Sequence, residues 1–564
     1  MRKLVIDQIS NQFDYKKDYA LGAWCFDKNL SLEKIIKKKI NKNIIENRIN
    51  QIKAFKCCEE QYSRIIKKIA FFLRKENNLK FSLNFFEHYV GYWLLDFIHL
   101  AHYSKRLSNT YKKKLKDQNL QLIIKFKTPD FHFLTTDDYL QKTHKNPYIF
   151  SHFVLKFLLK NKPKKWKVKR LSNNYYGNLK LRKSRIFSSV KNFFSNIIFS
   201  RVKHVSGFNK FEKFLLSLIL TFIKPKIKYN KLNNFQTLIK KSKLKPPVSD
   251  KELIDMVKEF IPKSYFQINK NKFFFLTNCN NRVMLCSSSS LINDDKKYIP
   301  LLFKELGGKI ISVQHGSAYG DASISIHHGH EYLFDKFISW GQKNHENYKV
   351  RFIPLPSPQL RQKMNYDKIK HNHKILFVST SNVFFQRKYI KMRSFDESCL
   401  RIKNSYEFLK NLNKKNLSKI LYKDSNYGHF SEKTFLKRNF KKMKFINKIP
   451  ENYVEDSKLI VMNNYSTFFF KALSMNIPTI LFCKKNCWGI TKKAQKLFEI
   501  LHKVEIIHYD PKLAAKKLDR NIFEWWYSNK TQKARKLFCN EFALNDSNTF
   551  KVWLRYFTKN SYSP

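Results

Sequence analysis

A histidine follows a short apolar run that has the composition of a buried β-strand. The run spans residues 310–313, Gln314-His315-Gly316 comes next, and a second small-residue turn, Tyr319-Gly320, follows at once. A neutral imidazole after a strand can take a proton from a hydroxyl nucleophile, because its reference pKa lies near working pH. A lone histidine often does no more than hydrogen-bond a turn, but the glycine turns favour a catalytic role for His315.

Two carboxylates stand between this histidine and the next predicted strand. Glu331 and Asp335 precede the apolar run 336–340, which Gly341 closes. Either carboxylate could serve as the base or orient it, and either could equally cap a local turn. The candidate catalytic residues are therefore His315, Glu331 and Asp335.

Three further histidines raise the question of a metal site. His327, His328 and His330 lie close together, but their spacing matches no established ligand pattern. Glu331 beside them adds only one hard ligand. The sequence therefore predicts no metal ion.

A second group of candidate residues follows predicted strands in the C-terminal half. Ser466 and Thr467 precede a helical segment, where a side chain can cap the helix and the free N–H groups favour a phosphate. The same two roles stay open for Ser379-Thr380-Ser381. Lys423 ends a further strand, and Tyr427-Gly428 lies in the loop after it. Neither a P-loop sequence nor GxGxxG occurs, so ATPase and dinucleotide-binding functions have no motif support.

These residues need strands to position them, and apolar runs alternate with helical segments in two series. The first series has helices at 251–260 and 298–306 and strands at 282–286, 310–313 and 336–340. The second has strands at 374–378, 420–423, 459–462, 479–482 and 505–508, with helices at 397–412, 467–475 and 492–501. Such alternation is typical of parallel α/β sheets, whose ligands bind at the carboxyl ends of the strands. The predicted fold class is α/β, with two doubly wound Rossmann-like domains facing a cleft.

The domain boundaries follow from where this alternation is clear. We expect residues 1–106 to begin the N-terminal domain, with strands at 3–6 and 21–25 and a long aromatic helix at 80–106. Alternation is lost over 107–245, which we expect to be a basic and irregular helical insertion. The remaining divisions are 246–350 for the rest of the N-terminal, acceptor-side domain, 351–545 for the C-terminal domain and 546–564 for a tail.

The charge of the chain is extreme. Lys and Arg number 110 against 43 Asp and Glu among 564 residues, a net charge of +67, while 43% hydrophobic residues exclude a mostly disordered chain. The excess is nearly all Lys and accompanies abundant Asn, Ile and Phe, which favours genome bias over a functional polyanion partner. Trp166, Tyr175 and Tyr176 lie among Lys and could stack nucleic-acid bases, but no recognised nucleic-acid module appears.

No segment is predicted to cross a membrane. An uninterrupted apolar run of about 18 residues is absent, and the N-terminus lacks the apolar core of a signal peptide. Nine cysteines without a CxxC pair predict reduced thiols in a cytoplasmic protein. Residues 214–223, flanked by Lys210, Lys213, Lys224 and Lys226, are either a buried helix or a segment that lies in a membrane interface.

Several segments resemble a known family in the same order along the chain. ISVQHGSAYG, HEYLFDKFISWG, KILFVSTS and KLIVMNNYSTFFFKALSMNIPTILF resemble bacterial transferases encoded in surface-polysaccharide (O-antigen) clusters, and LGAWC and FFEHYVGYWLLDFI look like that family's early segments. Those proteins are similar to GT-B glycosyltransferases and, more remotely, to CDP-glycerol glycerophosphotransferases of wall teichoic acid synthesis.

The resemblance implies a GT-B fold whose C-terminal half binds a nucleotide-activated donor and whose N-terminal half presents the acceptor. His315 matches the histidine of the QHG motif, a proposed base in the related polymer transferases. Ser466 and Thr467 match the hydroxyl residues around the donor phosphates. The expected donor-side residues are Gly316, Tyr319, Gly320, Ser379, Thr380, Ser381, Lys423, Tyr427, Gly428, Ser466, Thr467 and Lys471. Lys471 departs from the family, which usually has Glu there, suited to ribose hydroxyls.

The expected function is a metal-independent glycosyltransferase without a cofactor, which uses a nucleotide sugar and a surface-polysaccharide or lipid-linked glycan acceptor. We expect it in the cytoplasm or on the inner face of the membrane. Two alternatives remain: a polyol-phosphate transferase of the CDP-glycerol type, and a non-catalytic protein that binds nucleic acid or another polyanion.

Overall fold

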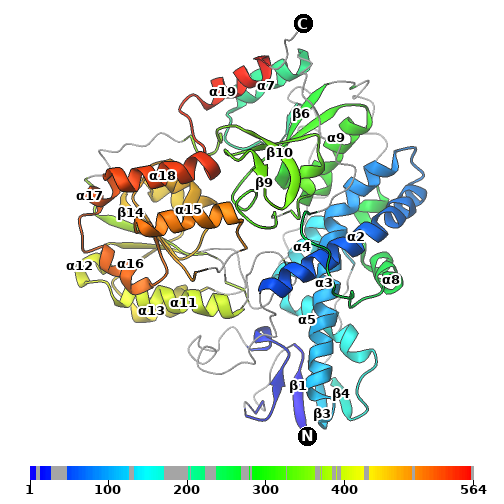
Figure 1. Ribbon diagram of the computed structural model, residues 1–564. Helices are drawn as coiled ribbons and strands as arrows, with labels where there is room; N and C mark the ends of the chain where they lie inside the picture. Colours follow the sequence, from blue (N-terminus) through cyan, green and yellow to red (C-terminus); the bar gives the residue numbers. More distant parts are fainter. Residues whose placement is uncertain are drawn as a thin grey trace.

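The computed structural model describes most of the chain, and Figure 1 shows its course. The residues described are 1–7, 13–14, 16–26, 48–125, 132–170, 201–203, 205–222, 237–268, 279, 282–325, 327–361, 369, 371–380, 382–383, 389, 395–424, 431–485 and 489–559. The helices are α2 (Arg48–Asn77), α3 (Leu83–Leu115), α4 (Thr136–Lys145), α5 (Pro147–Leu159), α7 (Lys210–Phe222), α8 (Asp250–Phe260), α9 (Asp294–Glu305), α11 (Phe395–Lys410), α12 (Lys414–Ser418), α13 (Lys433–Asn439), α14 (Thr467–Ser474), α15 (Lys492–Lys503), α16 (Pro511–Lys517), α17 (Ile522–Tyr527), α18 (Asn529–Phe542) and α19 (Thr549–Lys559). The strands are β1 (Arg2–Val5), β2 (Tyr19–Ala20), β3 (Leu120–Ile124), β4 (Trp166–Arg170), β5 (Val202–Lys203), β6 (Val283–Ser287), β7 (Lys309–Val313), β8 (Lys336–Ser339), β9 (Asn344–His345), β10 (Tyr348–Pro354), β11 (Lys374–Val378), β12 (Ile420–Lys423), β13 (Lys444–Ile446), β14 (Ser457–Met462), β15 (Thr479–Phe482) and β16 (Ile507–His508).

Six parallel strands form the sheet of the C-terminal half, in the order β13-β12-β11-β14-β15-β16. Successive side chains of a strand point to opposite faces, so Leu376 packs with α14, α15 and α18, whereas Phe377 packs with α11, α13 and α16. Helices therefore cover both faces, and the strand order reverses between β11 and β14. In such doubly wound sheets, ligands bind at the carboxyl ends of the strands where the order reverses.

A second six-stranded sheet lies in the N-terminal half, in the order β5-β6-β7-β8-β10-β9. Its strands are parallel except for the edge strand β9. Leu285 and Ile311 face α7 and α19, whereas Met284 and Ile310 face α3 and α9. Helices thus cover both faces of this sheet as well.

Two of the expected boundaries need correction. The division at residue 350 falls inside β10, which pairs with β8 and therefore belongs to the N-terminal sheet. The range 546–564, expected to be a tail, contains α19, which returns to the N-terminal half. Trp553 and Phe557 of α19 are fully buried against that sheet, so apolar burial holds the helix there.

A smaller parallel sheet, absent from the expected fold, has the order β2-β1-β3-β4. Strand β3 pairs with both β1 and β4. The range 107–245, expected to be an irregular insertion, therefore contains regular strands of this sheet. Trp166 is only 1% exposed, and its Nε1 donates to the carbonyl of Leu115 at 3.1 Å. It is a core residue rather than a platform for stacking bases. The strand expected at 21–25 is instead a 3-10 helix, Ala23–Cys25.

The expected aromatic helix at 80–106 is confirmed as α3, which extends further. Ser82 caps it by accepting the amide of Phe85 at 3.2 Å. Helices α2, α5, α8 and α9 pack around α3, so its apolar residues are buried on several sides. None of the helices in the described part of the chain is both long enough and apolar enough to cross a lipid bilayer.

Figure 1 shows the two six-stranded units side by side, with the small sheet at the N-terminal end of the molecule. Two doubly wound units with helices on both faces confirm the predicted α/β class and the GT-B-like arrangement. Parallel neighbouring strands need crossover connections, and the helices of these crossovers cover both faces of each sheet, so the strands between them are apolar.

Candidate active site

The loop after β7 touches the start of α14, and this contact joins the carboxyl edges of the two six-stranded sheets. The amide of Ser317 donates to Thr467 Oγ1 at 3.0 Å, and the two hydroxyl oxygens lie 3.4 Å apart. A Cβ added at Gly316 would lie 2.9 Å from Thr467 Oγ1, so glycine allows this close approach. The QHG loop and the start of α14 are therefore neighbours, although they follow strands of two different sheets.

A buried carboxylate anchors the same loop. Asp321 accepts the amides of Ala318 and Tyr319 at 2.8 and 3.0 Å, and the hydroxyl of Tyr465 donates to it from the C-terminal half. The carbonyl of Asp321 also accepts the amide of Thr491 at 2.9 Å. Asp321 was not among the predicted site residues, although a carboxylate directly after Gly320 in this loop was a signal that could have found it.

His315 is held from several directions. The neighbouring Gln314 donates to the carbonyl of Gly316 at 2.7 Å and accepts the amide of Trp340 at 2.9 Å, which fixes the backbone on both sides. The hydroxyl of Tyr319 hydrogen-bonds Nδ1 of His315, and the carbonyl of His315 accepts Gln359 Nε2 at 3.2 Å. Tyr319 is fully buried whereas His315 is half-buried. The imidazole is therefore partly exposed to solvent while a buried tyrosine holds its Nδ1.

The two predicted carboxylates do not join His315. Asp335 accepts the amide of Ile310 at 2.8 Å and pairs with Lys304 Nζ at 2.9 Å. Ile310 lies near the start of β7, whereas His315 follows the end of that strand, so Asp335 sits at the opposite edge of the sheet and its catalytic assignment is corrected. Glu331 is fully buried and accepts the hydroxyl of Ser325, and burial raises the pKa of its carboxyl to about 7.

A buried polar network lies where the strand order of the C-terminal sheet reverses. Ser379, after β11, donates to Glu432 Oε1 at 2.5 Å, and Tyr422 donates to the same oxygen. Asn463, after β14, donates to Ser379 Oγ and Ser405 Oγ at 2.9 Å each. Burial raises the pKa of Glu432, which favours its neutral form. No motif pointed to Glu432, because its partners come from distant parts of the chain.

A small pocket of about 20 Å³ lies beside this network, at the carboxyl ends of β14 and β15. It is lined by Glu397, Leu400, Arg401, Asn404, Asn463, Asn464, Cys483 and Lys484. Arg401 reaches Asn382 Oδ1 and Ser398 Oγ at 3.3 and 3.2 Å. Arg401 and Asn404 were not predicted, because they lie on α11 with no local motif. Lys484 lies two residues after the end of the predicted strand 479–482, and that position was a usable signal.

The remaining predicted donor-side residues have varied surroundings. Ser466 precedes α14 and makes no side-chain capping hydrogen bond. Lys423 Nζ donates to the carbonyl of Asn447 at 2.9 Å, and Lys471 Nζ lies 3.5 Å from Glu451 Oε1. Gly320 packs against the side chain of Gln342. Thr380 is half-buried after β11, whereas Ser381, Tyr427 and Gly428 lie outside the described residues.

The histidines that raised the question of a metal are buried against α3. Nε2 of His328 lies 3.7 Å from Asp96 Oδ1, and the ring of His328 stacks on His99 with centroids 5.1 Å apart. Burial lowers the pKa of His330 to about 3, so it stays neutral. Within the described ranges, no group of three or more His, Cys, Asp or Glu side chains is arranged to hold a metal ion.

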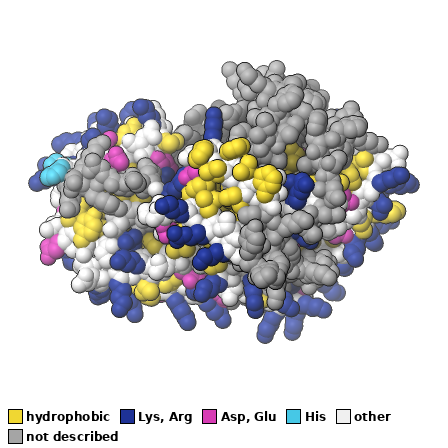
Figure 2. All heavy atoms as spheres, turned by 90° about the horizontal axis from the view of Figure 1, so that it is seen from above, with side chains coloured by type: hydrophobic (Ala, Val, Ile, Leu, Met, Phe, Trp, Pro, Cys, Tyr) yellow, Lys and Arg dark blue, Asp and Glu magenta, His cyan; other side chains and the backbone are white. Residues whose placement is uncertain are grey.

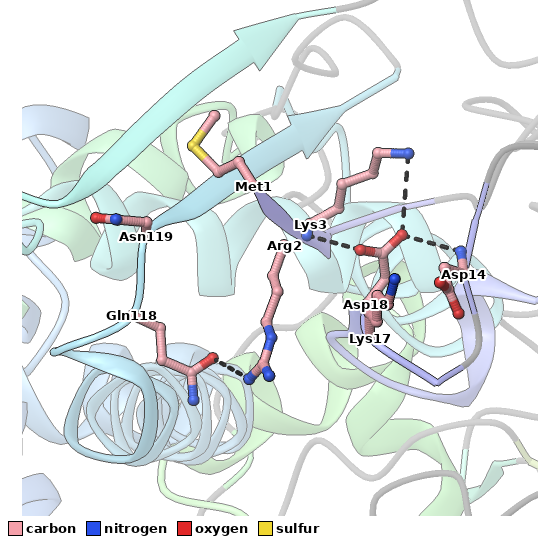
Figure 3. Close-up of a pocket in the computed structure, with 8 residues that line it drawn as sticks. All are labelled: Met1, Arg2, Lys3, Asp14, Lys17, Asp18, Gln118 and Asn119. Carbon is pink, nitrogen blue, oxygen red and sulfur yellow. Dashed lines mark hydrogen bonds and ion pairs between the residues drawn. The ribbon is translucent and has the colours of Figure 1, made fainter.

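Another pocket lies at the amino end of β1 (Figure 3). It is lined by Met1, Arg2, Lys3, Asp14, Lys17, Asp18, Gln118 and Asn119. Its charged groups contact one another: Asp18 accepts the amides of Lys3 and Asp14 at 2.9 and 3.0 Å. Ligands of open parallel sheets bind at the carboxyl ends of the strands. This pocket is therefore a weaker candidate than the junction around His315.

Two doubly wound units whose carboxyl edges meet around a histidine and a helix N-terminus define an α/β protein with a candidate site between the units. A family model described as LIC12162 family transferase matches residues 2–557. The chain belongs to this family and is a transferase, which confirms the predicted enzyme class.

A comparison with curated proteins gives no match. Three similar solved structures are the wall teichoic acid polymerase TagF with CDPG, the spinosyn forosaminyltransferase SpnP and a UDP-glucosyltransferase from Polygonum tinctorium. TagF has 12% identity over 50% of this chain and 81% of its own, with a TM-score of 0.28. SpnP has 8% identity over 55% of this chain and 79% of its own, with a TM-score of 0.25. The glucosyltransferase has 10% identity over 82% of this chain and 96% of its own, with a TM-score of 0.26. Likenesses this low identify neither a donor nor an acceptor for this chain.

Proposed function

We propose that this transferase moves a sugar from a nucleotide-sugar donor to a hydroxyl group of a surface-polysaccharide or lipid-linked glycan acceptor, without a metal ion. The observation that carries the proposal is the junction of Ser317 with Thr467, which places His315 beside the start of α14. A general base and a phosphate-binding helix terminus are the two components that such a transfer needs.

In this proposal His315 takes the proton of the acceptor hydroxyl as its oxygen attacks the anomeric carbon. If Nδ1–H donates to the oxygen of Tyr319, the lone pair lies on Nε2, which then accepts the proton. The bond from the anomeric carbon to the donor phosphate breaks, and the nucleotide leaves with the negative charge. Tyr319 acts through His315 and is therefore a positioning residue.

The leaving nucleotide is assigned to the C-terminal unit. Ser466, Thr467 and the first amides of α14 would bind its phosphate, since the positive end of the helix dipole meets the charge that develops there. Arg401 and Lys484 line the adjacent pocket and supply two cationic side chains. Lys471 lies one turn after Thr467 on α14 and pairs with Glu451. It is therefore not assigned a direct contact with the phosphate.

A thermal-shift screen tests the donor site. The full-length protein is heated with CMP, CDP, UDP, GDP and dTDP compounds, including CDP-glycerol, alongside Ser466→Ala and Arg401→Gln. Ser474→Ala, at the other end of α14, is the matched control. A nucleotide at about 100 times its dissociation constant adds about 2.7 kcal/mol of stability. We expect one nucleotide-sugar to raise the melting temperature of the wild type and the control but not of the two site variants.

The other outcomes are equally informative. Stabilisation by CDP-glycerol rather than by a nucleotide sugar would replace the proposal with polyol-phosphate transfer. Absence of any shift, together with steeply salt-dependent binding to RNA, would favour the polyanion-binding alternative. Loss of turnover in excess chelator would contradict the metal-independent assignment.

A further inference from the structure

Helix α7 presents an apolar stripe to solvent. Phe211, Phe214, Leu218 and Phe222 recur at helical spacing and are 66%, 37%, 45% and 79% exposed. The opposite face of α7 is buried: Leu216 and Leu220 belong to the core on the outer face of the N-terminal sheet. The sequence left two alternatives open for residues 214–223, a buried helix or a segment that lies in a membrane interface. The described part, up to Phe222, is a helix with only one face in the core.

Helix α19 lies beside α7 and adds positive charge. Its exposed cations Lys551, Arg555 and Lys559 recur every four residues and form one stripe. Trp553 and Phe557 point the other way, into the same core as Leu216 of α7. Since both helices bury their inner faces on one side of one sheet, the apolar stripe and the cationic stripe face outward together.

Acidic side chains are scarce on the two described helices of this surface. Helix α19 has none, and the single acid of α7, Glu212, is held by Arg361, whose Nη1 and Nη2 lie 2.5 Å from its two carboxylate oxygens. Lys210 and Lys213 lie on α7 itself, and the sequence continues with Lys224 and Lys226. Figure 2, which views this end of the molecule from above, shows apolar side chains gathered among Lys and Arg.

We propose that the outward face of α7 and α19 docks onto the surface of an anionic phospholipid bilayer. The exposed Phe and Leu side chains enter the boundary between headgroups and acyl chains, and the cations of α7 and α19 meet the lipid phosphates. Aromatic and apolar side chains bordered by Lys and Arg with almost no acids match this partner in both polarity and charge. A lipid surface also needs only one amphipathic face, whereas a protein partner needs a complementary surface.

The docking face is connected to the candidate active site. Arg361 holds α7 by donating to Glu212 and to the carbonyl of Gly207 at 2.9 Å, and Trp553 of α19 donates to the carbonyl of Pro356 at 2.9 Å. Between these anchor points, Gln359 donates to the carbonyl of His315 at 3.2 Å. If the proposed function holds, docking brings the His315 loop to the surface where lipid-linked acceptors reside.

Vesicle flotation of the full-length protein tests the proposal without any donor. Vesicles of phosphatidylcholine alone are compared with vesicles containing about 30% phosphatidylglycerol at about 0.1 M salt. Phe211→Ser with Phe222→Ser removes the two most exposed anchors, and Phe71→Ser, at an exposed Phe of α2, is the matched control. A second variant, Lys551→Gln, Arg555→Gln and Lys559→Gln, is matched by Arg74→Gln, Lys75→Gln and Lys80→Gln, which remove the same charge elsewhere.

We expect the wild type and both controls to float with anionic vesicles, and each docking variant to bind at least about tenfold more weakly. No flotation of the wild type, or equal binding by docking variants and controls, would overturn the proposal. A concentration-dependent dimer that the phenylalanine variant abolishes, without lipid binding, would assign the face to a second copy instead. The flotation assay contains no nucleotide, so its result is independent of the thermal-shift screen. The docking proposal can therefore fail while the proposed function holds, and the proposed function can fail while the docking proposal holds.

Discussion

The hydroxyl of Tyr465 donates a hydrogen bond to the buried carboxylate of Asp321, and this contact links the two halves of the enzyme. Tyr465→Phe removes that donor and leaves the carboxylate with the amides of Ala318 and Tyr319. We expect the variant to lose about 1–3 kcal/mol of unfolding free energy, because a buried charged acceptor loses a partner. Urea unfolding measures this loss.

Tyr527→Phe is the control for this variant, because Tyr527 is 36% exposed on α17. We expect its unfolding free energy to lie within about 0.5 kcal/mol of the wild type. Equal stability of the two variants would show that the contact between Tyr465 and Asp321 contributes nothing to joining the halves.

The pair of His315 and Tyr319 leads to a prediction about turnover, once the donor is known. His315→Ala removes the proposed base and should lower kcat about 10²–10⁴-fold. Tyr319→Phe removes the hydroxyl beside Nδ1 and should lower kcat about tenfold or more, with a shifted pH profile and an almost unchanged KM for the donor. Undiminished turnover in His315→Ala, with an unchanged melting temperature, would remove the histidine from this role.

The buried carboxyl of Glu331 predicts a dependence of stability on pH. Its pKa in the folded protein is about 7, above the ordinary value of 4.5 that holds in the unfolded chain. The neutral carboxyl therefore stabilises the fold fully below pH 4.5, and this contribution falls as the pH rises through 7, by about 3 kcal/mol in total. Glu331→Gln stays neutral, so it should gain stability relative to the wild type between pH 5 and pH 8.

Urea midpoints of the wild type and Glu331→Gln at both pH values measure this gain. Other groups that titrate in this range act equally in both proteins, so only the difference between them reports on Glu331. A difference that is the same at pH 5 and pH 8 would contradict the raised pKa.

A variant of Ser379 distinguishes a structural role of this hydroxyl from a role in donor binding. Its hydroxyl donates to Glu432 and accepts from Asn463, so Ser379→Ala should cost about 1–2 kcal/mol of stability. We expect the nucleotide-induced thermal shift to keep its wild-type size, because the hydroxyl is engaged inside the network. Thr380→Ala, at the next residue, is the control for stability. A lost nucleotide shift in Ser379→Ala with wild-type stability would assign this hydroxyl to the donor instead.

The local pattern was enough to locate most of the strands that carry the site. The strands predicted at 374–378, 420–423 and 479–482 coincide with β11, β12 and β15, since short β-branched runs bounded by polar loops have few alternatives. The sequence also predicted two such units facing a cleft, with the QHG loop and the start of α14 each following a strand of its own unit. Carboxyl ends of parallel strands share one edge within a sheet, but these two strands belong to different sheets, so only the tertiary structure shows that the two loops meet.

The error at Asp335 has a simple cause. The residue precedes β8, and in a parallel sheet the amino end of one strand lies at the opposite edge from the carboxyl end of its neighbour. Nearness in sequence to His315 therefore placed Asp335 on the wrong side. The small sheet around β3 was missed for another reason: its strands are short and stand in a Lys-rich context that hides the apolar pattern.

The sequence by itself determined the α/β class, the places of the candidate histidine and of the helix start that could bind phosphate, and the resemblance to a transferase family. Only the tertiary structure decided which side chains support them. Tyr319 beside His315, Tyr465 with Asp321, and Glu432 with Ser379 and Asn463 are contacts between side chains whose directions depend on packing. Periodicity fixes which face of an element a residue occupies, but distance between elements is set by the whole core.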